Sequence, residues 1–298
     1  MLPLFAGAND LFNTYLGSLK RDLSKDGFET ILLILSIALV GSPIFMIVLA
    51  VTGQFVMPTD PYFYLLWFGL TLLTVIQFSF FISGLVKAKF LAANTFANLA
   101  FVVTTFYAMI FLRESVGPLQ AMAVGMAAIG ALFFFDWKAL SQVGKPGADT
   151  SSNAGLFMIL FSLFLSPFGS ILYKAATLHA ATYAQFLTGR LTMDLGYYLL
   201  FFFIIFAFWH KKSPLPRMFS FVSTWPGVIF MVGSALANLL DSYLTYKLPL
   251  PLLTIIGTIA IPAGYFVGHI KYKEKIEARY VWGAAFIMLA VVLFVRAA

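Results

Sequence analysis

Long apolar runs separated by short polar breaks recur along the whole chain. The runs are about 20 residues long, which is the length that an α-helix needs to cross the hydrocarbon core of a membrane. The pattern predicts ten helices, at residues 2–19, 28–52, 61–85, 90–112, 118–136, 154–175, 182–209, 225–246, 250–270 and 279–296. Proline inside a helix favours a kink, as at Pro167 in the sixth run and Pro43 in the second, and Gly257 and Pro262-Ala263-Gly264 should soften the ninth. The predicted fold class is an all-α membrane protein with ten transmembrane helices.

Composition agrees with this pattern. Of the 298 residues, 61% are hydrophobic and 10% are charged, whereas a soluble domain is usually about 45–50% apolar and about 25% charged. A single soluble core of this size could not hide such an excess of apolar side chains. We therefore expect the lipid bilayer to surround the chain.

The positive charges predict the orientation of the helices. Loops after the first, third, fifth, seventh and ninth helices carry fourteen Lys and Arg residues, and the other side, with both termini, carries four: Arg113, Lys174, Lys247 and Arg296. Positive loops face the cytoplasm. We expect a multi-pass protein of the inner (plasma) membrane with both termini extracytoplasmic. The net charge of +7 is explained in this way, so no nucleic acid is expected as a partner.

The residue types exclude several kinds of site. The chain has no cysteine, so disulfides and thiolate metal sites are excluded. The three histidines are scattered without ligand spacing, and there is no phosphate-binding Walker loop. We expect no metal, no cofactor and no enzymatic activity.

The chain also contains an internal repeat. Glu114 and Glu274 hold corresponding positions in the two halves of the sequence, and each precedes a final helix rich in small residues. The longest polar stretch, 141–153, separates a first five-helix repeat at 1–140 from a second at 154–298. Because five is odd, the second copy enters the membrane from the opposite side, which is an inverted-topology repeat. We expect both glutamates to lie at helix ends and to serve this architecture.

Charges inside apolar helices mark candidate functional residues, because their burial is costly. Asp10, Arg190, Asp194 and Asp241 are clear cases, and Lys174 is a fifth. Arg190 and Asp194 are four residues apart on one helical face. Two interpretations stay open at this point: a mutual ion pair, or an arginine that holds a substrate anion while a neighbouring carboxylate titrates.

Neutral groups extend this set. The predicted substrate-binding residues are Arg190, Asn13, Lys174, Gln185, Asn238 and Tyr243. The predicted residues for coupling to a proton or another cation are Asp10, Asp194 and Asp241. Each amide side chain has the alternative role of holding neighbouring helices together. Aromatic residues near helix ends predict an interfacial belt of Tyr62, Phe63, Tyr64, Trp67, Trp209, Trp225 and Tyr280.

Several of these segments are similar to the drug/metabolite transporter superfamily, in particular its EamA-type members. The resemblance rests on the two glutamate-containing segments, on residues 6–9 in the first helix, on Tyr173-Lys174 and on Arg190. Ala6 replaces the tryptophan usual in the family, and Asp10 is an unusual charge there. The resemblance implies transport without ATP hydrolysis, mostly export of amino acids, drugs or other small metabolites.

The expected function is a secondary transporter of a small polar metabolite such as an amino acid, working as an exporter by alternating access. A channel or lipid scramblase is the alternative, and an intramembrane lipid-modifying enzyme is a further one. The sequence leaves the substrate, the coupling ion and the oligomeric state open. Gly130 and the other small residues of the fifth and tenth helices would serve contacts within a chain or between chains.

Overall fold

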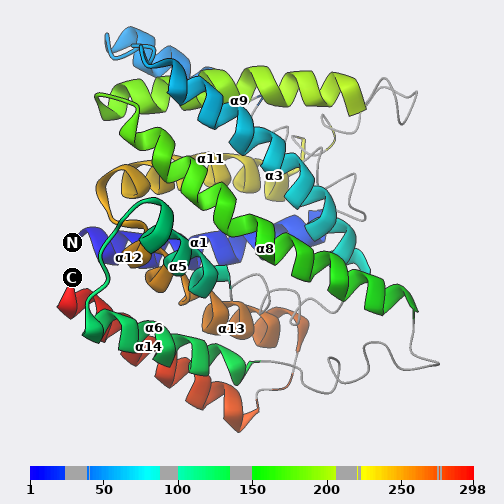
Figure 1. Ribbon diagram of the computed structural model, residues 1–298. Helices are drawn as coiled ribbons and strands as arrows, with labels where there is room; N and C mark the ends of the chain where they lie inside the picture. Colours follow the sequence, from blue (N-terminus) through cyan, green and yellow to red (C-terminus); the bar gives the residue numbers. More distant parts are fainter. Residues whose placement is uncertain are drawn as a thin grey trace. The chain divides into compact units, whose positions relative to one another are not determined.

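The computed structural model describes residues 1–23, 39, 41–87, 100–134, 150–205, 220, 223–273, 275 and 277–298. Within these ranges the chain is all-α (Figure 1). The helices are α1 (Leu2–Leu23), α3 (Pro61–Lys87), α5 (Ala100–Phe111), α6 (Pro118–Leu132), α8 (Thr150–Leu178), α9 (Tyr183–Ile205), α11 (Trp225–Lys247), α12 (Leu250–Gly257), α13 (Ala260–Tyr272) and α14 (Ala278–Ala297). A shorter helical stretch covers Gly41–Val51.

Where the structure describes them, the predicted helices agree with these bounds to within a few residues. Residues 28–38, 40, 90–99, 135–136 and 206–209 of the predicted helices lie outside the described residues. The ninth predicted helix is divided into α12 and α13 directly after Gly257, one of the two places where it was expected to be softened, whereas α13 continues through Pro262-Ala263-Gly264. α8 continues through Pro167 without a break. α8 also begins at Thr150, so the last four residues of the predicted linker are helical. Residues 135–149 lie outside the described residues.

Three helical stretches in the described ranges are long and apolar enough to cross a membrane. They are Trp225–Lys247, Leu250–Lys271, which joins α12 and α13, and Ala278–Ala297. Shorter apolar helices cover Gly41–Val51, Pro61–Thr74, Ala100–Phe111 and Pro118–Leu132. The described chain is thus all-α with three candidate membrane spans.

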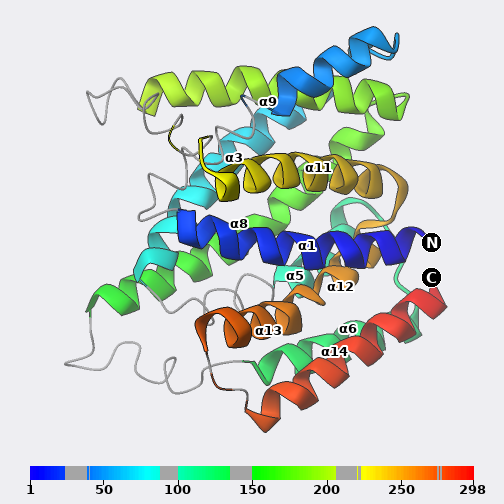
Figure 2. The same ribbon diagram turned by 180° about the vertical axis from the view of Figure 1, so that it is seen from behind.

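The chain divides into two compact units. Unit 1 comprises Met1–Tyr15, Leu73–Ile171 and Lys247–Ala298, and unit 2 comprises Leu16–Leu72 and Leu172–Tyr246. Each unit takes residues from both halves of the sequence. Both chain termini belong to unit 1 and lie at the same end of it (Figures 1 and 2).

Elements of unit 1 recur at a fixed spacing along the chain. The interval from the start of α5 to the start of α13 equals the interval from the start of α6 to the start of α14. Arg113 and Lys273 are separated by this same interval; they have φ angles of 54° and 55° and are the non-glycine residues with positive φ in the described chain. A left-handed residue ends a helix and turns the chain away from it. The same helix–turn–helix therefore occurs once in each half of the sequence.

α6 and α14 cross with their backbones almost in contact, side by side in both views (Figures 1 and 2). A Cβ added at Gly130 would lie 2.9 Å from the carbonyl oxygen of Gly283, and one added at Gly283 would lie 2.8 Å from that of Gly130. Ala123 and Ala290, which complete these faces, are fully buried. Small residues allow such close helix packing in membranes. In this structure Gly130 therefore packs within the chain.

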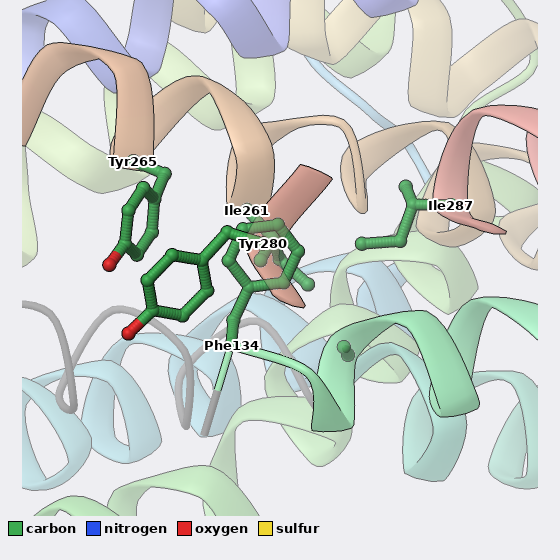
Figure 3. Packing of buried hydrophobic residues seen from close by; sticks show 6 residues of the cluster. Phe134, Ile261, Tyr265, Tyr280 and Ile287 are labelled. Atoms are coloured by element: carbon green, nitrogen blue, oxygen red, sulfur yellow. The ribbon is translucent and has the colours of Figure 1, made fainter. Parts of the chain in front are cut away.

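Aromatic rings close one end of this helix pair. Phe134, the second residue after α6, stacks on Tyr280 of α14 with ring centroids 5.5 Å apart, and Tyr265 of α13 packs against the same tyrosine (Figure 3). Ile261 and Ile287 complete the buried cluster. The prediction that Tyr280 belongs to an interfacial belt is wrong, because packing against α13 buries its ring.

Glu114 lies at a helix end, as expected. Its carboxylate accepts a hydrogen bond of 2.8 Å from the backbone N–H of Leu250, the first residue of α12. Free N–H groups and the positive end of the helix dipole both favour an anion at this position. Glu274 lies outside the described residues.

Unit 2 is built around an aromatic cluster. Phe63, Trp67 and Phe186 are buried at its centre, together with Ala176 and Ala180. Two residues of the predicted interfacial belt, Phe63 and Trp67, are therefore core residues, and that prediction is wrong for them. Tyr62 and Trp225 are exposed, which agrees with a belt position; Trp209 lies outside the described residues.

Substitution of Gly130 by alanine tests the crossing of α6 and α14. The added methyl group would overlap the backbone of Gly283, and overpacking of this kind typically costs about 1–3 kcal/mol. We expect Gly130→Ala to lower the midpoint of thermal unfolding in detergent.

Gly125→Ala is the matched control, because Gly125 lies on the exposed side of the same helix with no atom within 4 Å of an added Cβ. There the helix propensity of alanine should stabilise the protein by up to about 1 kcal/mol. Equal midpoints for the two variants would contradict the close crossing.

Candidate functional site

Arg190 and Asp194 lie together on α9, as their spacing predicted. The guanidinium Nε lies 3.5 Å from one carboxylate oxygen of Asp194, and the two side chains are 12% and 21% exposed. An ion pair that is shielded from water in this way is screened far less than one on a protein surface. The pair is the centre of the candidate site in unit 2.

The same guanidinium reaches two further helices. Its Nη1 donates hydrogen bonds to the phenol oxygen of Tyr173 on α8 and to the backbone carbonyl of Asn238 on α11, the second at 2.8 Å. The guanidinium carbon also lies 5.3 Å from the centre of the Tyr173 ring, within the range of a cation–π interaction. Arg190 therefore joins α9 to α8 and α11.

A serine closes these contacts into a ring. The Tyr173 hydroxyl donates to Ser242 Oγ at 3.1 Å, and Ser242 Oγ donates to the carbonyl of Asn238 at 2.6 Å. That carbonyl is the one that accepts from Arg190. Every hydroxyl in the ring thus has both a donor and an acceptor role, which is how polar groups remain satisfied in an apolar interior.

The second oxygen of Asp194 is held from α3. The indole N–H of Trp67 donates to it at 2.8 Å, and Trp67 is 1% exposed. The six residues described so far are called the arginine network: Trp67, Tyr173, Arg190, Asp194, Asn238 and Ser242. They bring α3, α8, α9 and α11 together at one place in unit 2.

Asn238 and Asp241 lie beside the network on α11. Asn238 joins the network through its backbone carbonyl, and its side chain is exposed. Asp241, one turn later on α11, is exposed and lies close enough to Arg190 for their charges to interact. The side chains of both residues are thus accessible beside the network.

Three other predicted residues lie around the network in unit 2. Lys174 is 7% exposed, and its ammonium group donates to the carbonyl of Thr245 at 2.6 Å. The Gln185 side chain accepts from the N–H of Ala181, so it contributes to capping the start of α9. Tyr243 packs edge-on against Tyr183. Each of these three side chains thus contacts another part of the protein.

Asp10 and Asn13 belong to unit 1. The Asp10 carboxylate lies beside the division between α12 and α13, where a Cβ added at Gly257 would come within 3.9 Å of it. Asn13 is exposed on α1. The role of Asp10 in coupling and that of Asn13 in substrate binding stay predictions.

Sequence reasoning missed Trp67 and Ser242 as parts of the site. Trp67 lies near the start of α3, where a tryptophan is typical of the membrane interface, and serines are common between membrane helices. Neither carries a charge that breaks the apolar pattern. Their contribution depends on which helix faces which, and a single sequence does not contain that information.

A separate side-chain hydrogen bond joins the start of α3 to the end of α8. Asp60 precedes Pro61 and accepts a hydrogen bond of 2.9 Å from the N–H of Tyr62, which caps the helix. Its other oxygen lies 2.7 Å from Nδ1 of His179. The hydrogen bond with His179 and that from Tyr62 hold the pKa of Asp60 below its ordinary value of 3.8.

This pKa shift predicts a pH dependence. Because the Asp60 pKa is lower in the folded protein than in the unfolded chain, its carboxylate stabilises the fold above the ordinary pKa of 3.8. The stabilisation is lost as pH falls through the lowered pKa. We expect the unfolding midpoint of Asp60→Asn to approach that of the wild type between roughly pH 4 and pH 2.

Glu277→Gln serves as the control, since it removes another exposed carboxylate. The difference between Asp60→Asn and the wild type should shrink in acid more than the difference between the control and the wild type. A constant difference across this pH range would rule out the stabilising role of the Asp60 charge.

Among the described residues, no group of three or more His, Asp or Glu side chains is placed to hold a metal ion. The polar groups that the structure brings together are instead hydrogen-bond donors and acceptors around one cation. Such an arrangement can bind a charged or hydrogen-bonding ligand.

No known family profile matches the sequence, and no curated protein matches it. Solved structures do match, with 28 chains in all. A crystal structure described only as "Crystal structure of protein" has a TM-score of 0.70 and 13% sequence identity, with 100% of this chain and 99% of the other covered. At this identity the similarity shows the fold alone. The class that can be stated is therefore an all-α protein with candidate membrane spans.

Proposed function

We propose that the chain is a secondary transporter of the drug/metabolite transporter superfamily, with ten membrane spans in two inverted five-helix repeats. It carries a small polar metabolite such as an amino acid across the plasma membrane, as an exporter, by alternating access. Three candidate spans and the apolar composition support the membrane location. The recurrence of α5, α6 and their left-handed turn at equivalent positions in the second half of the chain supports the repeat.

The arginine network is the observation that carries this proposal. A guanidinium that is only 12% exposed is costly in an apolar environment, and charges that persist in membrane helices commonly mark the path of a substrate or ion. A structural ion pair alone would need only Asp194. Arg190 instead has partners on three other helices when the link through Trp67 is included.

The donors of Arg190 suggest how a substrate is held. In the described residues its hydrogen bonds are made by Nε and Nη1, so Nη2 carries the N–H groups for an anionic end of the substrate. Asp241 supplies a negative charge nearby, and with Asp10 it is the candidate for coupling to a proton or another cation. Both oxygens of Asp194 accept hydrogen bonds, so its role in the proposal is to hold Arg190.

Membrane topology gives a first test, and the absence of cysteine makes single-cysteine labelling direct. Ala298→Cys and Gln54→Cys should react with a membrane-impermeant maleimide in intact cells, because their segments are expected outside. Lys275→Cys should react only after permeabilisation. Labelling of Lys275→Cys in intact cells would contradict the proposed orientation.

Transport by purified protein in liposomes tests the function itself. With a panel of labelled metabolites, we expect saturable uptake that is accelerated by unlabelled substrate on the opposite side. Arg190→Ala should reduce this exchange at least about tenfold, the factor that corresponds to about 1.4 kcal/mol of lost interaction.

Arg296→Ala is the matched control, because Arg296 is exposed at the end of α14. It should retain wild-type exchange. Full exchange by Arg190→Ala would refute the role of Arg190, and flux that neither saturates nor shows trans-stimulation would indicate a channel or scramblase.

A further inference from the structure

Trp67 on α3 is placed to orient Asp194, the carboxylate that pairs with Arg190. Trp67 has one hydrogen-bond donor, the indole N–H, and a buried indole N–H usually requires a partner. Here the partner is the carboxylate of Asp194, at 2.8 Å. A hydrogen bond to a charged acceptor is stronger than one between neutral groups.

The indole ring itself is fixed by its neighbours. It stacks on Phe63 with centroids 5.6 Å apart and planes 13° apart, and it contacts the rings of Tyr173 and Phe186. The ring cannot turn without displacing this cluster, since buried side chains interdigitate closely. The N–H of Trp67 therefore points in a direction that the core determines.

A glycine brings the two helices close enough for this contact. A Cβ added at Gly189 would lie 2.6 Å from the Phe63 ring and 2.6 Å from Pro58. Gly189 immediately precedes Arg190 on α9. The backbone that carries Arg190 is thus pressed against the segment that carries Trp67.

The two contacts of Asp194 differ in length. Oδ1 lies 2.8 Å from the indole nitrogen, whereas Oδ2 lies 3.5 Å from Nε of Arg190. The shorter contact with Trp67 fixes the carboxylate, and the carboxylate then meets only one edge of the guanidinium. Without the indole N–H, Asp194 would be free to turn toward Arg190 and to bind it through two parallel hydrogen bonds, the arrangement that this pair favours.

We propose that Trp67 is a positioning residue for the Arg190 site. It holds Asp194 away from Nη2 of the guanidinium and so keeps Nη2 available to the anionic end of the substrate. The proposal rests on the proposed transport function. Trp67 acts through Asp194 and touches no substrate. Its loss should weaken substrate binding more than it slows the transport cycle.

Trp67→Phe removes the N–H and keeps an aromatic ring in the cluster. We expect the KM for exchange to rise about tenfold, as for about 1.4 kcal/mol of lost interaction, with a smaller change in the maximal rate. Trp282→Phe is the matched control, because Trp282 is exposed on α14. It should leave both parameters unchanged. An unchanged KM in Trp67→Phe would overturn the proposal.

A double-mutant cycle separates positioning from packing. If Trp67 acts through Asp194, then Trp67→Phe should have little further effect on KM in an Asp194→Asn background, because residues that act through one contact are not additive. Loss of packing alone would give additive effects in the cycle. Additivity would therefore overturn the proposal.

A spectroscopic measurement remains decisive even where Trp67→Phe fails to fold. In a chain whose other four tryptophans are replaced by phenylalanine, the ¹⁵N-labelled indole of Trp67 reports its own hydrogen bond. Asp194→Asn should shift its N–H proton resonance upfield, whereas Asp241→Asn should leave it in place. An unchanged resonance in Asp194→Asn would overturn the proposal. Absence of transport by the wild type, with the shift observed, would instead refute the proposed function and leave the Trp67–Asp194 contact standing.

Discussion

The positive charge of Arg190 lies within a chain that is 61% hydrophobic, and the helices around it supply its partners. Asp194 on the same helix neutralises the charge and accepts from Nε. The Tyr173 hydroxyl and the carbonyl of Asn238 both accept from Nη1. Removal of one partner would leave a charged donor without an acceptor in an apolar interior, which is far more costly than the loss of an exposed hydrogen bond. The requirement to satisfy Nε and Nη1 of one guanidinium thus constrains α3, α8, α9 and α11 within unit 2.

Unit 1 depends on a different constraint, the close approach of two backbones. Gly130 and Gly283 allow α6 and α14 to cross where any side chain would overlap a carbonyl oxygen. These helices also begin at equivalent positions in the two halves of the sequence. A contact between equivalent elements is what an internal repeat produces when its two copies pack against each other. The aromatic cluster around Tyr280 then fixes one end of the pair.

Residue patterns predicted only part of the candidate site. The spacing of Arg190 and Asp194 predicted their pairing, because residues four apart on a helix share a face. The same reasoning selected Asn238 and Gln185 for their amide groups, but the backbone carbonyl of Asn238 is what binds Arg190, and the Gln185 amide contributes to capping α9. Trp67 was assigned to the membrane interface, yet it is buried and bonded to Asp194. Polar atoms shared by every residue, such as carbonyls, leave no signal in a sequence.

The sequence by itself determined where the helices of the described residues lie, because hydrophobicity and helix-ending turns act over short stretches of chain. It also indicated the internal repeat and the charges that interrupt the apolar runs. Tertiary structure alone decided which polar groups meet, since that depends on the rotation of each helix about its axis and on its neighbours. The contact of Trp67 with Asp194 joins residues 127 positions apart, and no local pattern relates them. The packing of Gly130 against Gly283 was settled in the same way, by the approach of two helices from opposite halves of the chain.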